Sequence, residues 1–126
     1  MIETEDLWYT YDGKRYVLKD VSITLRDGRY IAVMGENGAG KSTLVKHFNG
    51  LLKPSKGRVL VDGVDTREIP TSKLARKVAL VFQYPESMFF SETVKEEVQF
   101  ALKNFGYPEE VVESNTRKYL TIFGLE

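Results

Sequence analysis

Residues 35–43 carry the side chains of this chain best suited to chemistry. Their sequence, Gly-Glu-Asn-Gly-Ala-Gly-Lys-Ser-Thr, matches the pattern G-x-x-x-x-G-K-[ST] at Gly35, Gly40, Lys41 and Ser42. Glycines leave room for backbone amides to point inward at phosphate oxygens, and the lysine adds a positive charge. A serine hydroxyl at this position is a ligand for Mg²⁺. The loop therefore predicts a site for the phosphates of a nucleoside triphosphate and its magnesium ion.

Each residue of the loop has an expected role. Lys41 is expected to contact the β- and γ-phosphates, where its charge counts most as negative charge builds up in the transition state. Ser42 is assigned to Mg²⁺, and Thr43 is expected to donate to the α-phosphate. The predicted nucleotide-binding residues of the loop are Gly35, Asn37, Gly38, Ala39, Gly40, Lys41, Ser42 and Thr43. A chance match to the pattern has a probability of about one in 200 for a chain of this length.

A loop of this kind needs a strand before it and a helix after it. Residues 30–34 form a continuously apolar run, as expected of a strand buried on both faces. From Lys41 onward the apolar period becomes helical, with Leu44 and Phe48 on one face. Gly50 and Pro54 limit this helix. Both positioning elements are thus predicted independently of the loop.

Asp-Gly pairs between apolar runs predict tight turns, because glycine accepts the positive φ that such turns require. The runs are 6–11 and 15–18 around Asp12-Gly13, 21–25 and 30–34 around Asp27-Gly28, and 58–61 before Asp62-Gly63. Residues 72–77 resemble a short helix, and residues 78–82 a second buried strand. The first half of the chain is therefore predicted to be mainly hairpins.

The last third of the chain is predicted to be helical. Thr93 and Glu96 fit a capping box, in which the two side chains satisfy free amides at a helix start. An apolar stripe follows at helical spacing, and we expect it to be core: Val94, Val98, Ala101, Leu102 and Phe105. Gly106 ends this helix, and Pro108 begins the last one, which runs toward Phe123.

The composition narrows the function classes. Lysine plus arginine (18) balance aspartate plus glutamate (18) among the 126 residues, so bulk attraction to nucleic acid or anionic lipid is not expected. The absence of cysteine excludes disulfides and thiolate metal sites, and lone His47 is expected to be structural. Nothing resembles a signal peptide, and no apolar run reaches the ~20 residues that span a bilayer. We expect a cytoplasmic protein that meets a membrane only through a partner.

The loop, together with Asn-Gly-Leu-Leu-Lys-Pro-Ser-Lys-Gly at residues 49–57, resembles the nucleotide-binding domain of ABC transporters, over essentially the whole chain. The resemblance implies an α/β fold: part of a P-loop NTPase core with an N-terminal antiparallel β subdomain and the start of an α-helical subdomain. The implied regions are 1–34 and 57–70 for the β subdomain, 35–52 for the loop and its helix, 71–84 for a core helix and the Q-loop strand, and 85–126 for the helical subdomain.

Two further residues match positions of this family. Tyr11 lies in the early hairpin, where these proteins place an aromatic ring that stacks on adenine, although Tyr9 is a neighbouring strand aromatic. Gln83, in Val-Phe-Gln-Tyr-Pro-Glu, resembles the Q-loop glutamine, which contacts Mg²⁺ or the attacking water and senses the transport partner. The resemblance thus implies Lys41 and Gln83 as catalytic residues, and Ser42 and Gln83 as metal ligands.

Residues 83–90 and 93–101 are similar to the ATPases of energy-coupling-factor importers, which take up vitamins or metals such as cobalt and nickel. This similarity implies ATP and Mg²⁺ as cofactors. It also implies a second ATPase subunit, an integral-membrane subunit that binds near the Q-loop, and a peripheral place on the inner face of the membrane. Phe89 and Phe90 either line the groove for the membrane subunit or pack under the helices.

Several motifs of a complete ABC ATPase do not occur in the sequence. There is no Leu-Ser-Gly-Gly-Gln signature, no strand ending in the Walker B carboxylates, and no switch histidine. We therefore expect residues 1–126 to be the first half of a cassette, able to hold ATP but poor at hydrolysing it. Strand edges at residues 31–34 and 78–82 would lack neighbours, which predicts self-association.

Other classes remain open at this point. One is a non-hydrolysing nucleotide-binding module that a second chain completes. Genome-repair ABC-type ATPases place a coiled coil between their halves, but the sequence has no heptads. A small-molecule kinase would need an acceptor site and a lid, and a GTPase would need an Asn-Lys-x-Asp base reader, which is absent.

Overall fold

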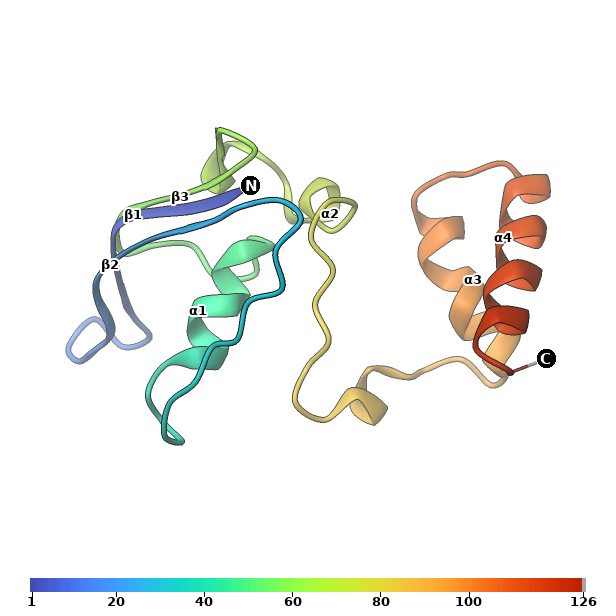
Figure 1. Ribbon diagram of the computed structural model, residues 1–126, viewed down its shortest axis with the longest axis horizontal. Coiled ribbons are helices and arrows are strands. Elements are labelled where there is room, and N and C mark those ends of the chain that lie inside the picture. Colours follow the sequence, from blue (N-terminus) through green and yellow to red (C-terminus); the bar gives the residue numbers. More distant parts are fainter. Residues whose placement is uncertain (126) are drawn as a thin grey trace. The chain divides into compact units, whose positions relative to one another are not determined.

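This computed structural model describes residues 1–125. The chain divides into two units, Met1–Leu80 and Val81–Glu126, which are considered separately (Figure 1). The first contains the sheet and the loop predicted to bind phosphate. The second contains the two long helices.

The first unit is built on a four-stranded antiparallel sheet with the strand order β2-β1-β3-β4 (Figure 1). The strands are β1 (Ile2–Thr10), β2 (Tyr16–Leu25), β3 (Lys56–Val61) and β4 (Val64–Asp65). Gly13 and Gly63, with φ of 79° and 80°, supply the left-handed turn residues after the two aspartates. The antiparallel β subdomain is thus confirmed, and so are the three predicted turns, since Asp27-Gly28 also turns with Gly28 at a φ of 71°.

A small apolar core joins this sheet to the helix that follows the loop. Leu7, Leu18 and Val59, from three neighbouring strands, are almost completely buried and form one cluster. Leu44 of α1 (Lys41–Phe48) packs against the cluster from the helix side. Burying each such side chain contributes about 2 kcal/mol, so this packing fixes the start of α1 relative to the sheet.

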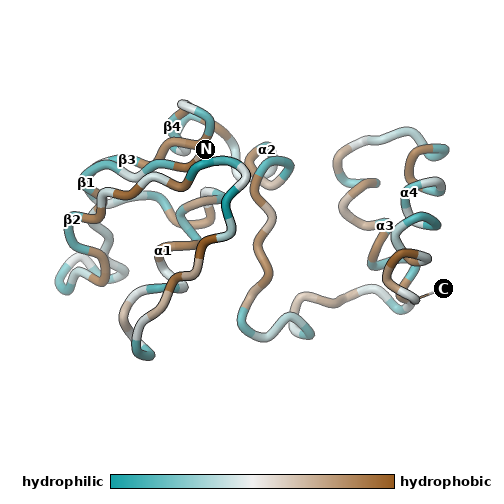
Figure 2. The backbone as a smooth tube through the Cα atoms, viewed as in Figure 1, coloured by the Kyte–Doolittle hydropathy of each residue, from teal (hydrophilic) through white to brown (hydrophobic). Residues whose placement is uncertain are grey.

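The two predicted strands at 30–34 and 78–82 are not strands. Within residues 1–125 neither segment belongs to the sheet, and Met34 and Val81 are 88% and 74% exposed. Figure 2 shows the second segment, which follows α2 (Thr71–Leu74), as an apolar stretch of extended chain. An apolar run becomes a strand only where another strand accepts its hydrogen bonds, and no described strand does so here.

The hairpin predicted around Asp27-Gly28 is also wrong. Residues 21–25 continue β2, which runs without interruption from Tyr16 to Leu25 beside β1. The chain then turns and passes as irregular structure into the loop. One edge of β2 pairs with β1, and within residues 1–125 no strand pairs with its other edge.

The short helical elements of the first unit are shorter than predicted. α1 ends at Phe48, just before Gly50 with a φ of 78°, and α2 ends at Leu74, although backbone hydrogen bonds continue the turn to Val78. A 3₁₀ turn, η1 (Thr66–Glu68), precedes α2. Helix ends fray by one or two residues. The spacing of apolar residues therefore predicts where a helix lies more accurately than where it begins and ends.

The second unit contains η2 (Pro85–Met88), α3 (Val94–Asn104) and α4 (Glu109–Ile122). Thr93 caps α3 as predicted, because its hydroxyl accepts a hydrogen bond from the Glu96 amide at 3.1 Å. The stripe expected to be core is buried only in part: Val98, Leu102 and Phe105 are half-buried, whereas Val94 and Ala101 are exposed. None of the described helices is long and apolar enough to cross a bilayer.

Candidate functional site

The loop of residues 35–40 runs directly into α1, and its glycines are required by geometry. Gly38 and Gly40 have φ of 84° and 101°, a backbone region that side chains disfavour. A Cβ on Gly40 would also lie 3.1 Å from Cδ2 of Leu18. The Ala39 amide donates to the Glu36 carbonyl at 3.1 Å and closes a turn at the tip. The loop thus keeps its path only with glycine at these positions.

The N-terminus of α1 is open to an anion. Its N-cap residue is Gly40, no side chain caps the helix, and the first turn contains no acidic residue. The first amides of a helix have no acceptor within the helix, and they lie at the positive end of its dipole. Such a terminus, combined with a glycine loop, is a binding site for phosphate.

Lys41 reaches back across its own loop. Its ammonium donates to the carbonyl oxygens of Gly35 at 2.5 Å and Glu36 at 2.9 Å. The positive charge is therefore held at the mouth of the loop, beside the uncapped helix start. A phosphate seated on these amides would meet this charge without rearrangement of the backbone.

Tyr11 and Thr43 meet, although 32 residues separate them. The Tyr11 hydroxyl and Thr43 Oγ1 share a hydrogen bond of 2.8 Å, while the Tyr11 side chain stays 59% exposed. Thr43 is buried in the first turn of α1. The structure therefore brings the predicted base-stacking residue, with a largely exposed side chain, to the predicted phosphate-binding helix.

Ser42 and Gln83, the predicted metal ligands, are both exposed. Ser42 belongs to the first turn of α1, in the first unit, whereas Gln83 precedes η2 in the second unit. In the part of the chain that the structure describes, no group of three or more His, Cys, Asp or Glu side chains could hold a metal ion. The role of Gln83 stays a prediction.

His47, which the sequence predicts to be structural, supports this site from inside α1. Its side chain is fully buried, and Nδ1 pairs with the carbonyl oxygen of Thr43 at 2.8 Å. The Tyr9 ring packs edge-on against the imidazole, with centroids 4.8 Å apart. Thr43 and His47 are four residues apart in a helix and therefore lie on the same face. This spacing was the signal in the sequence that the two residues could be in contact.

Burial lowers the pKa of His47 below its usual value of 6.5, and the carbonyl groups of Thr43 and Lys53 only partly oppose this shift. The folded chain therefore binds fewer protons than the unfolded chain below about pH 6.5. We expect the free energy of unfolding of the first unit to fall as the pH drops from about 6.5 toward the lowered pKa. The slope approaches 1.4 kcal/mol per pH unit.

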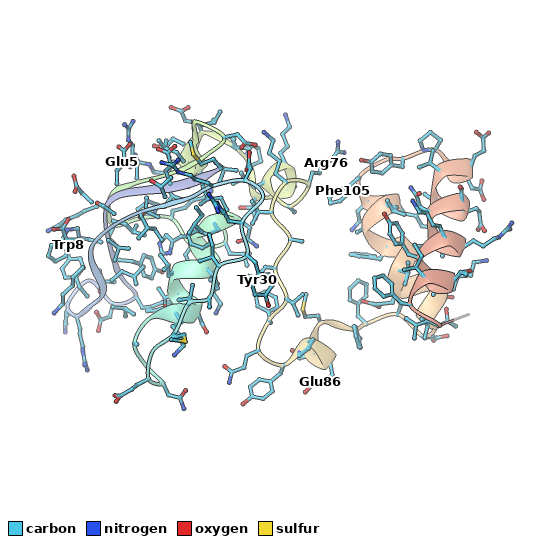
Figure 3. All side chains as sticks on the ribbon, in the orientation of Figure 1. Glu5, Trp8, Tyr30, Arg76, Glu86 and Phe105 are labelled. Atoms are coloured by element: carbon cyan, nitrogen blue, oxygen red, sulfur yellow. The ribbon has the colours of Figure 1, made fainter. Side chains whose placement is uncertain are left out.

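Urea unfolding at several pH values between about 7.5 and 5 tests this expectation, because His47 is the only histidine and ordinary histidines titrate in this range. Trp8, the only tryptophan, lies in β1 and reports on the sheet by fluorescence (Figure 3). The His47→Gln variant should show a flatter pH dependence, whatever its overall stability. An unchanged slope in this variant would assign the titration to other groups.

The protein-family model described as "ABC transporter" matches residues 18–124 of the chain. This range contains the loop, α1 and Gln83. The chain belongs to the ABC transporter family. This family binds ATP, and the resemblance seen in the sequence is thereby confirmed.

Relatives across the ABC family agree. A Pyrococcus furiosus protein named as an ABC transporter ATP-binding protein is 48% identical over 126 residues, which are 100% of this chain and 48% of that protein. The energy-coupling factor transporter ATP-binding protein EcfA of Methanocaldococcus jannaschii is 41% identical over 128 aligned residues, covering 100% of this chain and 46% of that protein. The chain thus spans about half the length of the curated relatives it matches.

Solved ABC structures confirm the fold class. The structure of cbiO1 from Clostridium perfringens, described as part of the ABC transporter complex cbiONQ, superposes with a TM-score of 0.84 at 35% identity. It matches 99% of this chain and 51% of that chain. A dimeric ATP-binding cassette bound to ADP and Pi superposes with a TM-score of 0.81 at 27% identity, over 100% of this chain and 58% of that one.

Proposed function

We propose that residues 1–126 form the ATP-holding part of an ABC-type subunit that hydrolyses ATP to power an importer. One observation carries the proposal: an uncapped helix start and a glycine loop surround the Lys41 ammonium, beside an exposed aromatic ring. The triphosphate would lie on the loop amides of residues 35–43, and adenine would stack on Tyr11. Each of these groups comes from the first unit.

We propose Ser42 as the magnesium ligand of the first unit and Gln83 as a further ligand or water contact. Mg²⁺ binds few protein groups and completes its shell with phosphate oxygens and water, so an exposed hydroxyl beside the phosphates fits it without a carboxylate cluster. When bound, the ion neutralises charge on the β- and γ-phosphates. Ser42 would orient it from the first turn of α1.

Hydrolysis is proposed to need groups beyond these residues. The relatives are about twice as long as this chain, and its sequence contains neither the Leu-Ser-Gly-Gly-Gln signature nor Walker B carboxylates. Lys41 and Gln83 would contribute to catalysis, but positioning of the attacking water would fall to the remaining half. We therefore propose that residues 1–126 alone bind ATP and turn it over slowly.

The partners and substrate are proposed from the relatives. One relative is an energy-coupling factor ATPase, and another structure is part of a complex with the name cbiONQ. These names support a place in a transporter complex. We propose that a membrane subunit docks near Gln83 and the exposed Phe89 and Phe90, that a second ATPase subunit takes part, and that the chain lies at the inner membrane face. From the resemblance to energy-coupling-factor importers in the sequence, we propose vitamins or metal ions as the cargo.

A non-hydrolysing module completed by a second chain is the other candidate. The exposed apolar runs at 30–34 and 78–82 favour it, because they offer unpaired backbone groups to strands from elsewhere. The same feature supports the proposed self-association. Both candidates bind ATP, so a binding measurement tests the shared part.

Titration with ATP and with GTP, each with and without Mg²⁺, tests the nucleotide assignment. We expect ATP to bind more tightly than GTP, and Mg²⁺ to strengthen ATP binding. Ser42→Ala should remove most of the gain from Mg²⁺, about tenfold for one lost contact to a charged group. Ser72→Ala, which removes an exposed hydroxyl from α2, is the matched control and should keep the gain. Equal affinity for GTP, or no binding, would contradict the proposal.

A further inference from the structure

Thr43 and three aromatic side chains of the first unit form a closed ring of contacts. The Tyr11 hydroxyl lies 2.8 Å from Thr43 Oγ1. The Tyr11 ring meets Tyr9 edge-on at 4.8 Å, and Tyr9 meets His47 edge-on at 4.8 Å. Nδ1 of His47 returns to the Thr43 carbonyl oxygen at 2.8 Å. Thr43 is thus held at its backbone by one aromatic side chain and at its hydroxyl by another.

We propose that the Tyr11 hydroxyl positions Thr43 for phosphate, in addition to the stacking of the Tyr11 ring on a base. Tyr11 donates its proton to Thr43 Oγ1, which leaves the Thr43 proton free to donate to a phosphate oxygen. Tyr11 is then a positioning residue for the phosphate end of the nucleotide. This inference rests on the proposed ATP site.

The acidity of the two hydroxyls sets the direction of the hydrogen bond. A phenol is far more acidic than an aliphatic alcohol and is the stronger donor, so Tyr11 gives its proton and Thr43 accepts it. A hydroxyl that accepts one hydrogen bond becomes a better donor of the next, because such chains polarise cooperatively. The chain from Tyr11 through Thr43 to phosphate therefore strengthens the last contact.

The Tyr11 contact also competes with another arrangement of the Thr43 hydroxyl. A threonine in a helix often donates to the carbonyl four residues earlier, which for Thr43 is that of Ala39. This would turn the Thr43 proton away from the loop mouth. In the structure the hydrogen bond formed by Thr43 Oγ1 is the one with Tyr11, at 2.8 Å. Tyr9, packed between Tyr11 and His47, keeps the Tyr11 ring in place.

Inorganic tripolyphosphate separates positioning from stacking, because it carries phosphates but no base. With Mg²⁺ present, we expect Tyr11→Phe to bind tripolyphosphate about three- to tenfold more weakly than the parent chain, the usual effect of one hydrogen bond. Thr43→Val should weaken binding at least as much, and adding Tyr11→Phe to it should cause no further loss. Thr43→Ser, which keeps the hydroxyl, should bind within about twofold of the parent.

Tyr16→Phe is the matched control, because it removes a phenol from β2 that contacts Trp8 and Lys56 rather than the loop. It should leave tripolyphosphate binding unchanged, and Trp8 fluorescence verifies that each variant is folded. Unchanged or tighter tripolyphosphate binding by Tyr11→Phe overturns the inference while ATP binding by the parent upholds the nucleotide site. Failure of the parent to bind both ATP and tripolyphosphate overturns the proposed function, and the inference with it.

Discussion

Replacement of Lys41 by alanine is expected to lower the affinity for ATP about 100-fold. Charge-assisted hydrogen bonds contribute about 1.5–3 kcal/mol each, and every 1.4 kcal/mol is a factor of ten in affinity. Lys41 holds its ammonium on two carbonyl oxygens at the mouth of the loop, at 2.5 and 2.9 Å. Phosphate oxygens carry full charge and form stronger bonds than these carbonyls, so the exchange favours the nucleotide. Equilibrium titration with ATP and Mg²⁺ measures the loss.

Lys46→Ala supplies the control for the Lys41 variant. Lys46 lies in the last turn of the same helix, and its removal changes the net charge by the same amount. Its affinity for ATP should stay within about twofold of the parent, since its charge lies at the opposite end of α1. If both variants lost affinity equally, general electrostatic attraction would explain binding. If Lys41→Ala bound ATP as well as the parent, the phosphate loop would be wrongly assigned.

Features set by neighbouring residues in the chain could be predicted from the sequence. The glycines of the loop, the turns at Asp12-Gly13 and Asp62-Gly63, and the cap at Thr93 all depend on two to four consecutive residues. In each case the local chemistry leaves few alternatives: a positive φ favours glycine, and a free amide favours a hydroxyl. The structure places these features where the sequence predicts them.

The segments at residues 30–34 and 78–82 could not be predicted correctly from consecutive residues alone. An apolar run indicates burial, but a strand also needs hydrogen bonds from another strand, which no property of the run itself supplies. The described residues provide no such partner for either segment. The relatives that this chain matches are about twice its length.

The contact between Tyr11 and Thr43 could not be predicted for a related reason. It joins residues 32 positions apart, and tertiary packing, including that of Leu44 against the core cluster, brings α1 to the strands. The bond between His47 and Thr43 is different, because it spans one helical turn and was within reach of the sequence. A single histidine on the apolar face of the helix that follows the loop indicated that its side chain could hydrogen-bond the backbone of the first helical turn.

Replacement of Gly57 by alanine is expected to destabilise the first unit strongly. Gly57, in β3, has a φ of 75°, and an added Cβ would overlap the carbonyl oxygens of Glu5 and Asp6. These carbonyls belong to an irregularity of β1, where the register with β3 shifts between Glu5 and Trp8. Backbone cannot move aside as a side chain does, so β1 and β3 must separate. That would also open the core between Leu7 and Val59.

Gly63→Ala isolates the effect of this overlap. Gly63 has nearly the same φ, 80°, but no atom within 4 Å of an added Cβ. It should cost only about 1–2 kcal/mol, the usual price of a left-handed alanine. Gly57→Ala adds the clash and should cost several kcal/mol more, a large part of the 5–15 kcal/mol that stabilises a typical domain. Urea unfolding followed by Trp8, which pairs with Lys56 beside Gly57, measures both. Similar midpoints for the two variants would mean that β1 can yield at its irregularity, and that the close approach to Gly57 does not hold the sheet together.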